Sequence, residues 1–325
     1  MIKQLLHVSV GTLFLISFSA TAVFSAKTIE KRFPIGPGGS LEMDVQGSSV
    51  TVEGSTRSNV HVRVESKKDI EENWVLSFEQ QGDRLIITAE GKKESRLFGL
   101  IKTFSGKGLE FTVSVPENFN PQIRTSGGSI RTSTISGTVD IHTSGGSLTC
   151  EQIAGSFSGH TSGGSINLNG IEGPFDAKTS GGSITAKELA GDGSLKTSGG
   201  SINVEGCRGS LEARTSGGGI TVTGLDGPAT AQTSGGGITM EMVNSPSGDC
   251  ELKTSGGGIN LTMPRESNVM IYAKTSGGKV HTDLPVTVTV QGEASRGHLE
   301  GKIGNGGPLV SLKTSGGSIR ISATD

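Results

Sequence analysis

The tetrapeptide Thr-Ser-Gly-Gly recurs along this chain at a fixed interval. It begins at Thr125, Thr143, Thr161, Thr179, Thr197, Thr215 and Thr233, with a constant spacing of 18. It returns at Thr254, Thr275 and Thr314, after gaps of 21, 21 and 39. Such spacing is typical of a solenoid, whose repeats bury their faces on their neighbours. Because the last gap equals one of 18 and one of 21, we expect a further coil between Thr275 and Thr314 with a degenerate tetrapeptide.

Within each repeat, apolar residues alternate with polar ones. Residues five and seven positions after the threonine are mostly aliphatic, as in Ile166 and Leu168. The tenth position is also apolar and holds Val243 in its repeat, and a second alternating pair precedes the next threonine, as in Phe175 and Ala177. A period of two indicates strands with one buried face. Two such strands in each repeat, separated by glycines, leave no room for a helix in the repeats.

Strands of identical pattern at a fixed spacing pair in parallel by winding into a coil, with a rise of about 4.8 Å from one coil to the next. The sequence therefore predicts an all-β fold, a single-stranded parallel β-solenoid or β-helix whose coil is one repeat long. A left-handed hexapeptide helix can have coils of the same length, but it needs an aliphatic residue at every sixth position, and the apolar positions here break that rule. We expect a right-handed coil, as parallel crossovers generally are.

The threonine of the tetrapeptide continues the inward alternation of the strand before it. We expect these threonines to form a buried ladder with their hydroxyls hydrogen-bonded at the corner of the coil. The paired glycines are expected to let the backbone take a positive φ at this turn.

Composition and charge narrow the range of functions. The 29 basic and 31 acidic residues give a net charge of -2, whereas a nucleic-acid-binding protein usually carries a basic excess. We therefore expect no nucleic acid partner. Only 32% of the residues are hydrophobic, which suits a narrow core repeated along an axis better than a thick globular one.

The N-terminal segment, positions 1–26, has the pattern of a secretory signal peptide. Lys3 supplies the positive start, an apolar run extends from Leu5 to Phe18, and Ala20-Thr21-Ala22 or Val23-Phe24-Ser25 offers a cleavage site. The apolar run is short for a membrane span. We expect an exported protein of the periplasm, cell surface or extracellular space, without a membrane span and without a lipid anchor, because no cysteine lies near the cleavage sites.

The remaining chain divides into two parts. Residues 27–124 are predicted to form irregular β coils and a cap, with alternating segments at 40–45, 49–53, 59–65, 84–90 and 109–115 and a polar loop at 92–108. Residues 125–325 are predicted to form the regular solenoid. Atypical terminal repeats are expected of such a fold.

Several segments carry a resemblance to a known family. They are Phe33 with Gly39-Ser40-Leu41-Glu42, the strand from Leu109 to Pro116, the Lys-Thr-Ser-Gly-Gly-x-Ile units, and the closing stretch from Gly301 to Ile321. Together they resemble the DUF4097 β-strand repeat family, whose label is "putative adhesin". The resemblance implies a solenoid fold and an adhesin-like role, and it carries no catalytic residue.

The residue before each threonine is basic in nine of the ten repeats, with Gln232 as the exception. These residues are Arg124, His142, His160, Lys178, Lys196, Arg214, Lys253, Lys274 and Lys313. Alternation places them on the outer face, where they form either a binding surface for an anionic glycan or another envelope polymer, or a charged strand stripe that only keeps the surface soluble. Asp140, Asp176, Glu212 and Glu251 lie two positions earlier on the same face and neutralise part of this charge.

Other chemistry has weaker support. His142 and His160 lie one repeat apart, but two histidines lack the third firm ligand of a zinc site, so we expect no metal and no cofactor.

Acidic residues are spread at one per coil, whereas a polysaccharide-cleaving β-helix needs several carboxylates in one cleft. We therefore expect a non-enzymatic, adhesin-like structural or binding module of the cell envelope or surface. The second possibility is a β-helix lyase or hydrolase acting on polysaccharide, and a cluster of three or more acidic residues within about 10 Å would favour it. The oligomeric state is left open.

The three cysteines make a sharper prediction. Cys150, Cys207 and Cys250 lie in different repeats, at positions that are aliphatic elsewhere. Coils two or more apart are separated by about 10 Å or more, whereas a disulfide needs Cα atoms within about 7 Å. We expect three buried, unpaired thiols.

Overall fold

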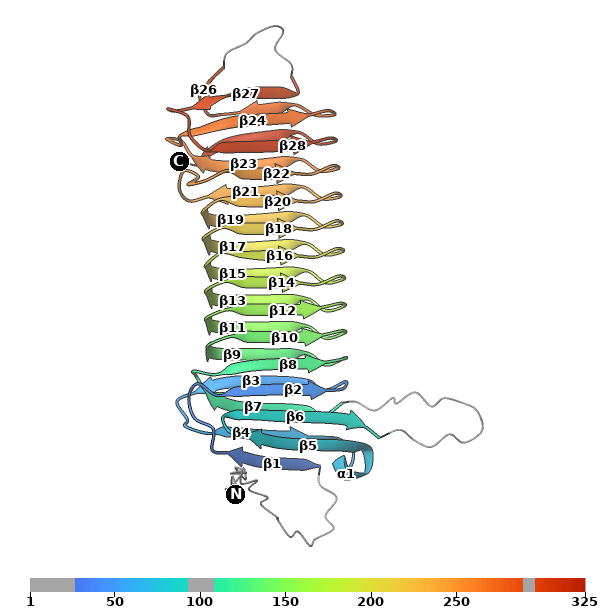
Figure 1. The fold of residues 1–325 in the computed structure, drawn as a ribbon. Coiled ribbons are helices and arrows are strands. Elements are labelled where there is room, and N and C mark those ends of the chain that lie inside the picture. Colours follow the sequence, from blue (N-terminus) through green and yellow to red (C-terminus); the bar gives the residue numbers. More distant parts are fainter. Residues whose placement is uncertain (1–26, 93–107, 289–295, 325) are drawn as a thin grey trace, which may run out of the picture.

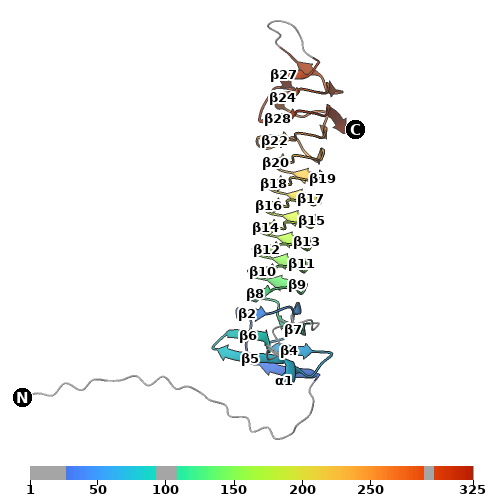
Figure 2. The ribbon, with the colours of Figure 1, turned by 90° about the vertical axis from the view of Figure 1, so that its right-hand side faces the viewer.

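Two long β-sheets face each other along a slender rod (Figures 1 and 2). The structure is a computed structural model that describes residues 27–92, 108–288 and 296–324. The signal peptide predicted at 1–26 and most of the loop predicted at 92–108 lie outside these residues. The one helix of the described chain is α1 (Ile70–Asn73), in the N-terminal part of the rod. No described helix is long and apolar enough to cross a membrane.

The first sheet, sheet A, contains 14 strands. In spatial order they are β1 (Thr28–Phe33), β4 (Val60–Glu65), β7 (Glu110–Pro116), β3 (Ser49–Ser55), β9 (Ile130–Ser136), β11 (Leu148–Ala154), β13 (Ile166–Glu172), β15 (Ile184–Ala190), β17 (Ile202–Arg208), β19 (Ile220–Asp226), β21 (Ile238–Met242), β23 (Ile259–Pro264), β29 (Ile319–Thr324) and β25 (Val280–Thr282).

The second sheet, sheet B, contains 15 strands. In the reverse spatial order, so that the two sheets run alike, they are β5 (Trp74–Gln81), β6 (Arg84–Gly91), β2 (Ser40–Val45), β8 (Asn120–Thr125), β10 (Val139–Thr143), β12 (Phe157–Thr161), β14 (Phe175–Lys178), β16 (Gly193–Lys196), β18 (Leu211–Arg214), β20 (Ala229–Gln232), β22 (Cys250–Lys253), β28 (Leu309–Thr314), β24 (Val269–Thr275), β27 (His298–Ile303) and β26 (Val286–Thr287).

The middle of the rod is a parallel solenoid. Each coil contributes one strand to each sheet, and each strand pairs with its counterpart one repeat later, as Leu148 does with Ile166 in sheet A and Val139 with Phe157 in sheet B. The predicted all-β solenoid is thus the fold of the chain. The handedness of its coil stays a prediction.

The core is a continuous column of apolar, mostly aliphatic side chains between the sheets. The inward positions predicted from alternation are buried, among them Ile166, Leu168 and Ala177. The prediction for Val243 is wrong, because this side chain is 57% exposed. The register between β19 and β21 shifts there, so that Met242 takes the buried place opposite Leu225.

The coils at the N-terminal end do not stack in the order of the chain. The coil of β2 and β3 lies between the coil of β6 and β7 and the coil of β8 and β9. Antiparallel pairs β1–β4, β4–β7 and β5–β6 close this end. These antiparallel pairs end the parallel stacking of the coils at this end and cover the edge that would otherwise be open to pairing with another strand.

The opposite end shows the same interchange. The coil of β28 and β29 pairs with β22 and β23 on one side and with β24 and β25 on the other. The further coil expected between Thr275 and Thr314 is not formed by the described residues of this segment, so that prediction is wrong. They instead supply β27, which runs antiparallel to β24, and β26, which pairs antiparallel with β27.

The ten Thr-Ser-Gly-Gly corners form one column. The ten threonines are buried, as predicted. Each hydroxyl donates to a backbone carbonyl of the adjacent coil, as Thr161 Oγ1 does to Gly146 O at 2.7 Å. In most corners the second glycine N–H donates to the same hydroxyl, as Gly164 N does at 3.3 Å. The ladder therefore links each of these ten corners to the coil beneath it through side chains as well as through the sheets.

The expected reason for the two glycines is wrong. The positive-φ glycines of the described chain lie outside these corners, for example at Gly155 in the other turn of its coil. The second glycine is required by close stacking instead, since a Cβ on Gly146 would lie 2.0 Å from the carbonyl oxygen of Gly128. The first glycine has more room, because the nearest atom to a Cβ on Gly145 would be 3.6 Å away.

Candidate functional site

The nine basic residues predicted from the repeat lie in one row on the outer face of sheet B. With Gln232 they pair directly from coil to coil. In stacking order this basic row is Arg124, His142, His160, Lys178, Lys196, Arg214, Gln232, Lys253, Lys313 and Lys274. Its last two members are reversed relative to the sequence, because the coil of β28 lies below that of β24.

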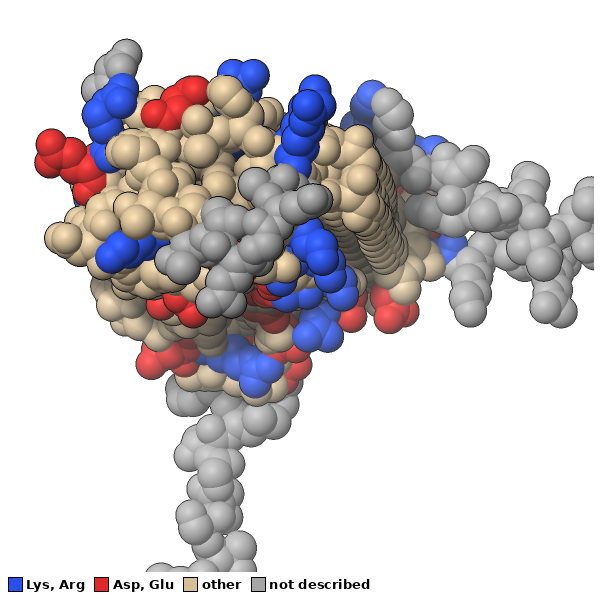
Figure 3. All heavy atoms as spheres, turned by 90° about the horizontal axis from the view of Figure 1, so that it is seen from above, with Lys and Arg blue, Asp and Glu red and all other residues tan. Residues whose placement is uncertain are grey.

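Alternation along the short strands of sheet B turns these side chains outward. In β16, for example, Leu195 and Thr197 on either side of Lys196 are buried, so Lys196 points away from the core. Seen down the rod, basic and acidic side chains gather beside the column of stacked corners (Figure 3). The row therefore lies on a sheet surface rather than in a cleft.

Carboxylates neutralise part of the row. Glu212 contacts two of its members, with Lys196 Nζ 2.7 Å from Oε2 and Arg214 Nε 2.5 Å from Oε1. The hydrogen bond from Lys196 is the largest cause of a pKa of Glu212 below its usual value; partial burial opposes this shift, and the charge of Arg214 adds to it. Glu251 accepts a hydrogen bond from Gln232 at 3.3 Å. The centre of the row is thus an ion-paired segment.

Other members of the row keep their charge uncompensated. Within the described chain, Arg124, Lys178, Lys253 and Lys274 have no carboxylate within ion-pair distance. Their side chains are exposed. These four positions, distributed from one end of the row to the other, are where an added anion would meet the least competition.

The two histidines of the row lie side by side. The rings of His142 and His160 are 6.2 Å apart, and His160 Nε2 lies 3.4 Å from Asp176 Oδ2. No group of three or more metal-ligating side chains occurs among the described residues. The pair therefore lacks the ligand set of a zinc centre.

Sequence reasoning missed how the row ends. Tyr272 lies beside it, with Lys313 Nζ 5.3 Å from the ring centroid and the ring of His298 packed edge-on at 5.3 Å. His298 comes from the antiparallel strand β27 and pairs with Lys274. The spacing of the repeats could not predict the contact between Tyr272 and His298, because His298 belongs to the C-terminal cap and not to a repeat.

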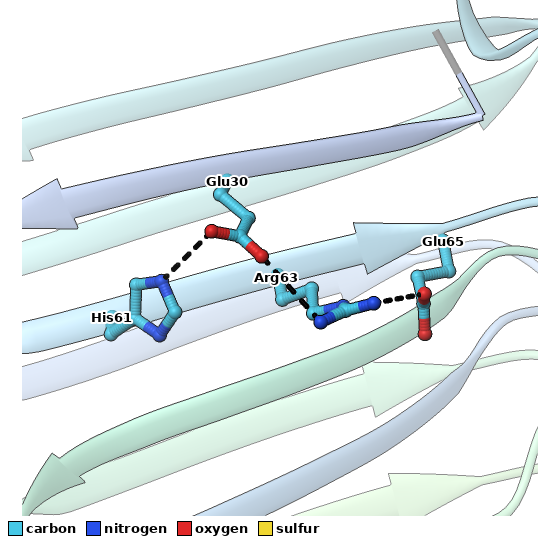
Figure 4. Close-up of polar contacts among 4 residues, drawn as sticks. All are labelled: Glu30, His61, Arg63 and Glu65. Atoms are coloured by element: carbon cyan, nitrogen blue, oxygen red, sulfur yellow. Dashed lines mark hydrogen bonds and ion pairs between the residues drawn. The ribbon is translucent and has the colours of Figure 1, made fainter.

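A second charged cluster, also missed, lies on the outer face of sheet A at the N-terminal end (Figure 4). Glu30 lies between two basic side chains, with His61 Nε2 at 3.8 Å and Arg63 Nη1 at 3.5 Å. Arg63 Nη2 lies 2.6 Å from Glu65 Oε1, and this hydrogen bond is the main reason that the pKa of Arg63 is raised. The residues meet because β1 and β4, which are not consecutive in the chain, pair antiparallel, and alternation alone does not reveal this pairing.

Glu65 also faces Glu110 across β4 and β7. Both line an open depression of about 700 Å³, together with Ser49, Ser66 and Lys67. Two carboxylates at one depression are the minimum for hydrolysis of a glycosidic bond. Arg63 neutralises one of them.

The cysteine prediction is confirmed. Cys150, Cys207 and Cys250 are all buried and unpaired. Burial raises the pKa of Cys150 to about 12 and that of Cys207 to about 11, and it raises the pKa of Cys250 as well. Such thiols pack as small hydrophobic groups and are poor nucleophiles.

Comparison with known proteins gives a family match and distant structural likenesses. A family model described as Toastrack DUF4097 matches residues 39–322. No curated protein matches the chain. A crystal structure of a "putative adhesin" from Bacteroides fragilis is 9% identical, with 92% of this chain and 97% of that chain covered and a TM-score of 0.37.

Two further crystal structures are similar over the same shares of both chains, 92% of this chain and 97% of the other. One is a "putative adhesin" from Parabacteroides merdae, 10% identical with a TM-score of 0.36. The other is a "Putative lipid binding protein" from Parabacteroides distasonis, 14% identical with a TM-score of 0.32.

Proposed function

Because this chain belongs to the Toastrack DUF4097 family, a family of β-solenoids, we propose that it is an exported, non-enzymatic, adhesin-like module that binds a linear anionic polymer, such as an acidic glycan of the cell envelope or surface. The observation that carries the proposal is the continuous basic row on sheet B. Nine basic side chains stand in direct register along the rod, and only Gln232 interrupts them.

The geometry of the row favours an extended ligand over a small one. Adjacent coils are about 4.8 Å apart, so a polymer lying along the rod meets one cation per coil. Each exposed ion pair is worth little by itself, about 0–1 kcal/mol. An extended polyanion makes several such contacts in one molecule, and the later contacts benefit from the high effective concentration that the first one creates.

The attraction is local, because the whole chain has a net charge of -2. At physiological ionic strength charges act over about 8 Å, which spans the neighbouring coils of the row but not the full width of the molecule. Uncompensated Lys178 and Lys253 therefore act with their immediate neighbours, and binding should weaken steeply as salt is added.

The test is retention on an immobilised acidic glycan at low and at high salt. Replacing the uncompensated Lys178, Lys253 and Lys274 with Gln should abolish retention at low salt, while the wild-type protein should be retained at low salt and released at high salt. A matched control replaces the same number of cations on sheet A, as Arg131→Gln, Lys187→Gln and Arg208→Gln. Equal retention of both triple variants would mean that the basic row is only a solvated face.

Export is part of the proposal and rests on the N-terminal sequence. Cleavage at either predicted site leaves a mature chain that starts between Val23 and Lys27. Amino-terminal sequencing of protein recovered outside the cytoplasm tests this. A chain that retains residues 1–22 and fractionates with the cytoplasm would contradict it.

A second candidate function is cleavage of a polysaccharide at the depression lined by Glu65 and Glu110. The observation that favours it is the direct pairing of these two carboxylates across β4 and β7. Release of reducing ends from acidic and neutral glycans, abolished by Glu110→Gln, would support it. Glycan retention that depends on the basic row without any such release supports the binding module instead.

A further inference from the structure

The coil formed by β28 and β29 occupies a slot between two coils that both precede it in the chain. In sheet B, Leu312 of β28 pairs with Leu252 of β22 on one side and with Ala273 of β24 on the other. In sheet A, Ile319 of β29 lies between Ile259 and Val280 in the same way. This coil is therefore an insert in a stack whose two walls are already complete.

The two walls of the slot match each other without the insert. Three pairs of residues, one member from each flanking coil, occupy equivalent positions: Leu252 with Ala273, Lys253 with Lys274, and Thr254 with Thr275. The first two pairs each flank one residue of β28, and the two threonines belong to the same corner ladder. The interval from Thr254 to Thr275 equals the interval from Thr233 to Thr254. The coil of β24 and β25 thus has the spacing and register needed to stack directly on β22 and β23 when the insert is absent.

The insert is held by contacts that an identical coil would reproduce. Its inward side chains Val310, Leu312, Ile319 and Ile321 are fully buried. Thr314 Oγ1 donates to Gly257 O below it at 2.7 Å. Gly317 O accepts the same kind of bond from the coil above, again at 2.7 Å.

The insert enters its slot through one short connection, residues 304–308. This connection crosses the end of β24, since β27 and β28 lie on opposite sides of that strand. Asn305 N donates to Asn268 Oδ1 and Leu309 N to Asp249 Oδ1, both at 2.8 Å. Withdrawal of the insert removes β29 from between β23 and β25, and β25 can then pair with β23 in its place.

We propose that the β28–β29 coil is an exchangeable insert, and that its partner is a second copy of this chain: each molecule donates its coil to the slot of the other. Every contact inside the slot is then the same in both arrangements, and only the connection changes its path. Exchange of an identical element between protomers is a low-cost route to a dimer. A dissimilar segment would leave the four aliphatic sites and the threonine corner unfilled.

The length of the connection gives a direct test in the full chain. Two strand spacings, about 10 Å, separate β27 from β28, and the six steps from Ile303 to Leu309 reach at most about 21 Å when extended. Deleting Asn305, Gly306 and Gly307 leaves three steps, which reach about 10 Å without slack for the turn. The variant should donate its coil to a partner and elute as a dimer in size-exclusion chromatography. Inserting three glycines after Gly306 lengthens the same connection instead and should leave the elution unchanged.

A synthetic peptide of residues 308–324 distinguishes a dimer formed by exchange of the β28–β29 coil from a dimer formed through another surface. In excess it should fill the slots and convert the dimer into a monomer–peptide complex, whereas a peptide carrying Ile319→Asp and Ile321→Asp should not. A variant that stays monomeric, or a dimer that the wild-type peptide does not dissolve, would overturn the proposal.

A second measurement does not depend on the deletion. The full-length variant Leu312→Ala weakens its own insert and should take up fluorescent peptide at least tenfold faster than Leu195→Ala, which makes the same change at the equivalent buried position of β16. Equal rates, or no uptake by either variant, would overturn the proposal even if the deletion variant fails to fold.

Discussion

The hydroxyl of Thr197 donates a 2.7 Å hydrogen bond to the carbonyl oxygen of Gly182, which lies one coil below. The same hydroxyl accepts from Gly200 N at 3.3 Å. The two bonds use the donor and an acceptor site of one buried side chain, and they repeat at neighbouring corners. Each corner is therefore tied both to itself and to the coil beneath it.

Replacing Thr197 with Val should destabilise the rod by about 1–3 kcal/mol, because the similar shape is kept while a part-buried carbonyl loses its donor. Urea unfolding followed by circular dichroism measures the effect. Thr185→Val, on the outer face of sheet A, serves as the control and should change the midpoint little. Equal midpoints for the two variants would show that the ladder adds no stability.

The two glycines of one corner should differ sharply in their tolerance of a methyl group. Gly146→Ala should cost more than about 2 kcal/mol, because its Cβ would collide with the Gly128 carbonyl, which belongs to the backbone and cannot swing away. Gly145→Ala should be neutral or slightly stabilising, since its Cβ meets only ordinary contacts and the unfolded chain loses freedom. Thermal unfolding of both variants decides this, and a larger loss for Gly145→Ala would contradict the stacking explanation.

The buried cysteines should make the protein less stable in alkali. A thiol with a pKa near 9 when unfolded, raised to about 12 in the fold at Cys150, ionises first in the unfolded chain. Stability is therefore full below pH 9 and falls as the pH rises from there, by at most about 1.4 kcal/mol per pH unit for one such group. Cys150→Val should show a shallower loss between pH 8.5 and 10 than the wild type; parallel curves would contradict the assignment.

Thiol reagents should label the native protein only after denaturation.

Removing one carboxylate should strengthen the basic row. Glu212→Gln frees Lys196 and Arg214, so retention on an acidic glycan should increase and extend to higher salt. Glu205→Gln is the matched control, because it frees Lys187 on the other sheet, where the two side chains are 2.5 Å apart. An equal gain for both variants would indicate that net charge and not the row governs retention.

Spacing and alternation were sufficient to predict most of the regular rod. The position of Thr161 and the apolar residues around it predicted two strands per coil, a buried threonine and an outward His160, and all three are found. The prediction works because each coil contacts mainly its two neighbours. A side chain that points inward within its own strand is therefore also buried in the stacked rod. The cysteines followed from the same register.

The predictions that are wrong, and the contacts that were missed, concern features that the repeat pattern does not encode. Val243 lies in one of the longer repeats, and the extra residues shift the register so that Met242 replaces it in the core. The cluster of Glu30, His61 and Arg63 depends on antiparallel pairing in the cap, and no period in the sequence marks such pairs. The corner glycines were identified by position, but the short distance from Gly146 to Gly128 that requires them exists only once the coils are stacked.

The repeat pattern was therefore enough to predict the solenoid, its inward and outward faces and the positions of the basic residues, because those depend on contacts that repeat with the chain. The order of the coils at both ends became known from the three-dimensional pairing of the strands. Thr254, Thr314 and Thr275 present the same residues at the same register positions, so several stacking orders satisfy the local pattern equally well. The choice depends on the non-repeating strands β26 and β27: β27 pairs antiparallel with the outer edge of β24, so the β28 coil lies on the other side of β24.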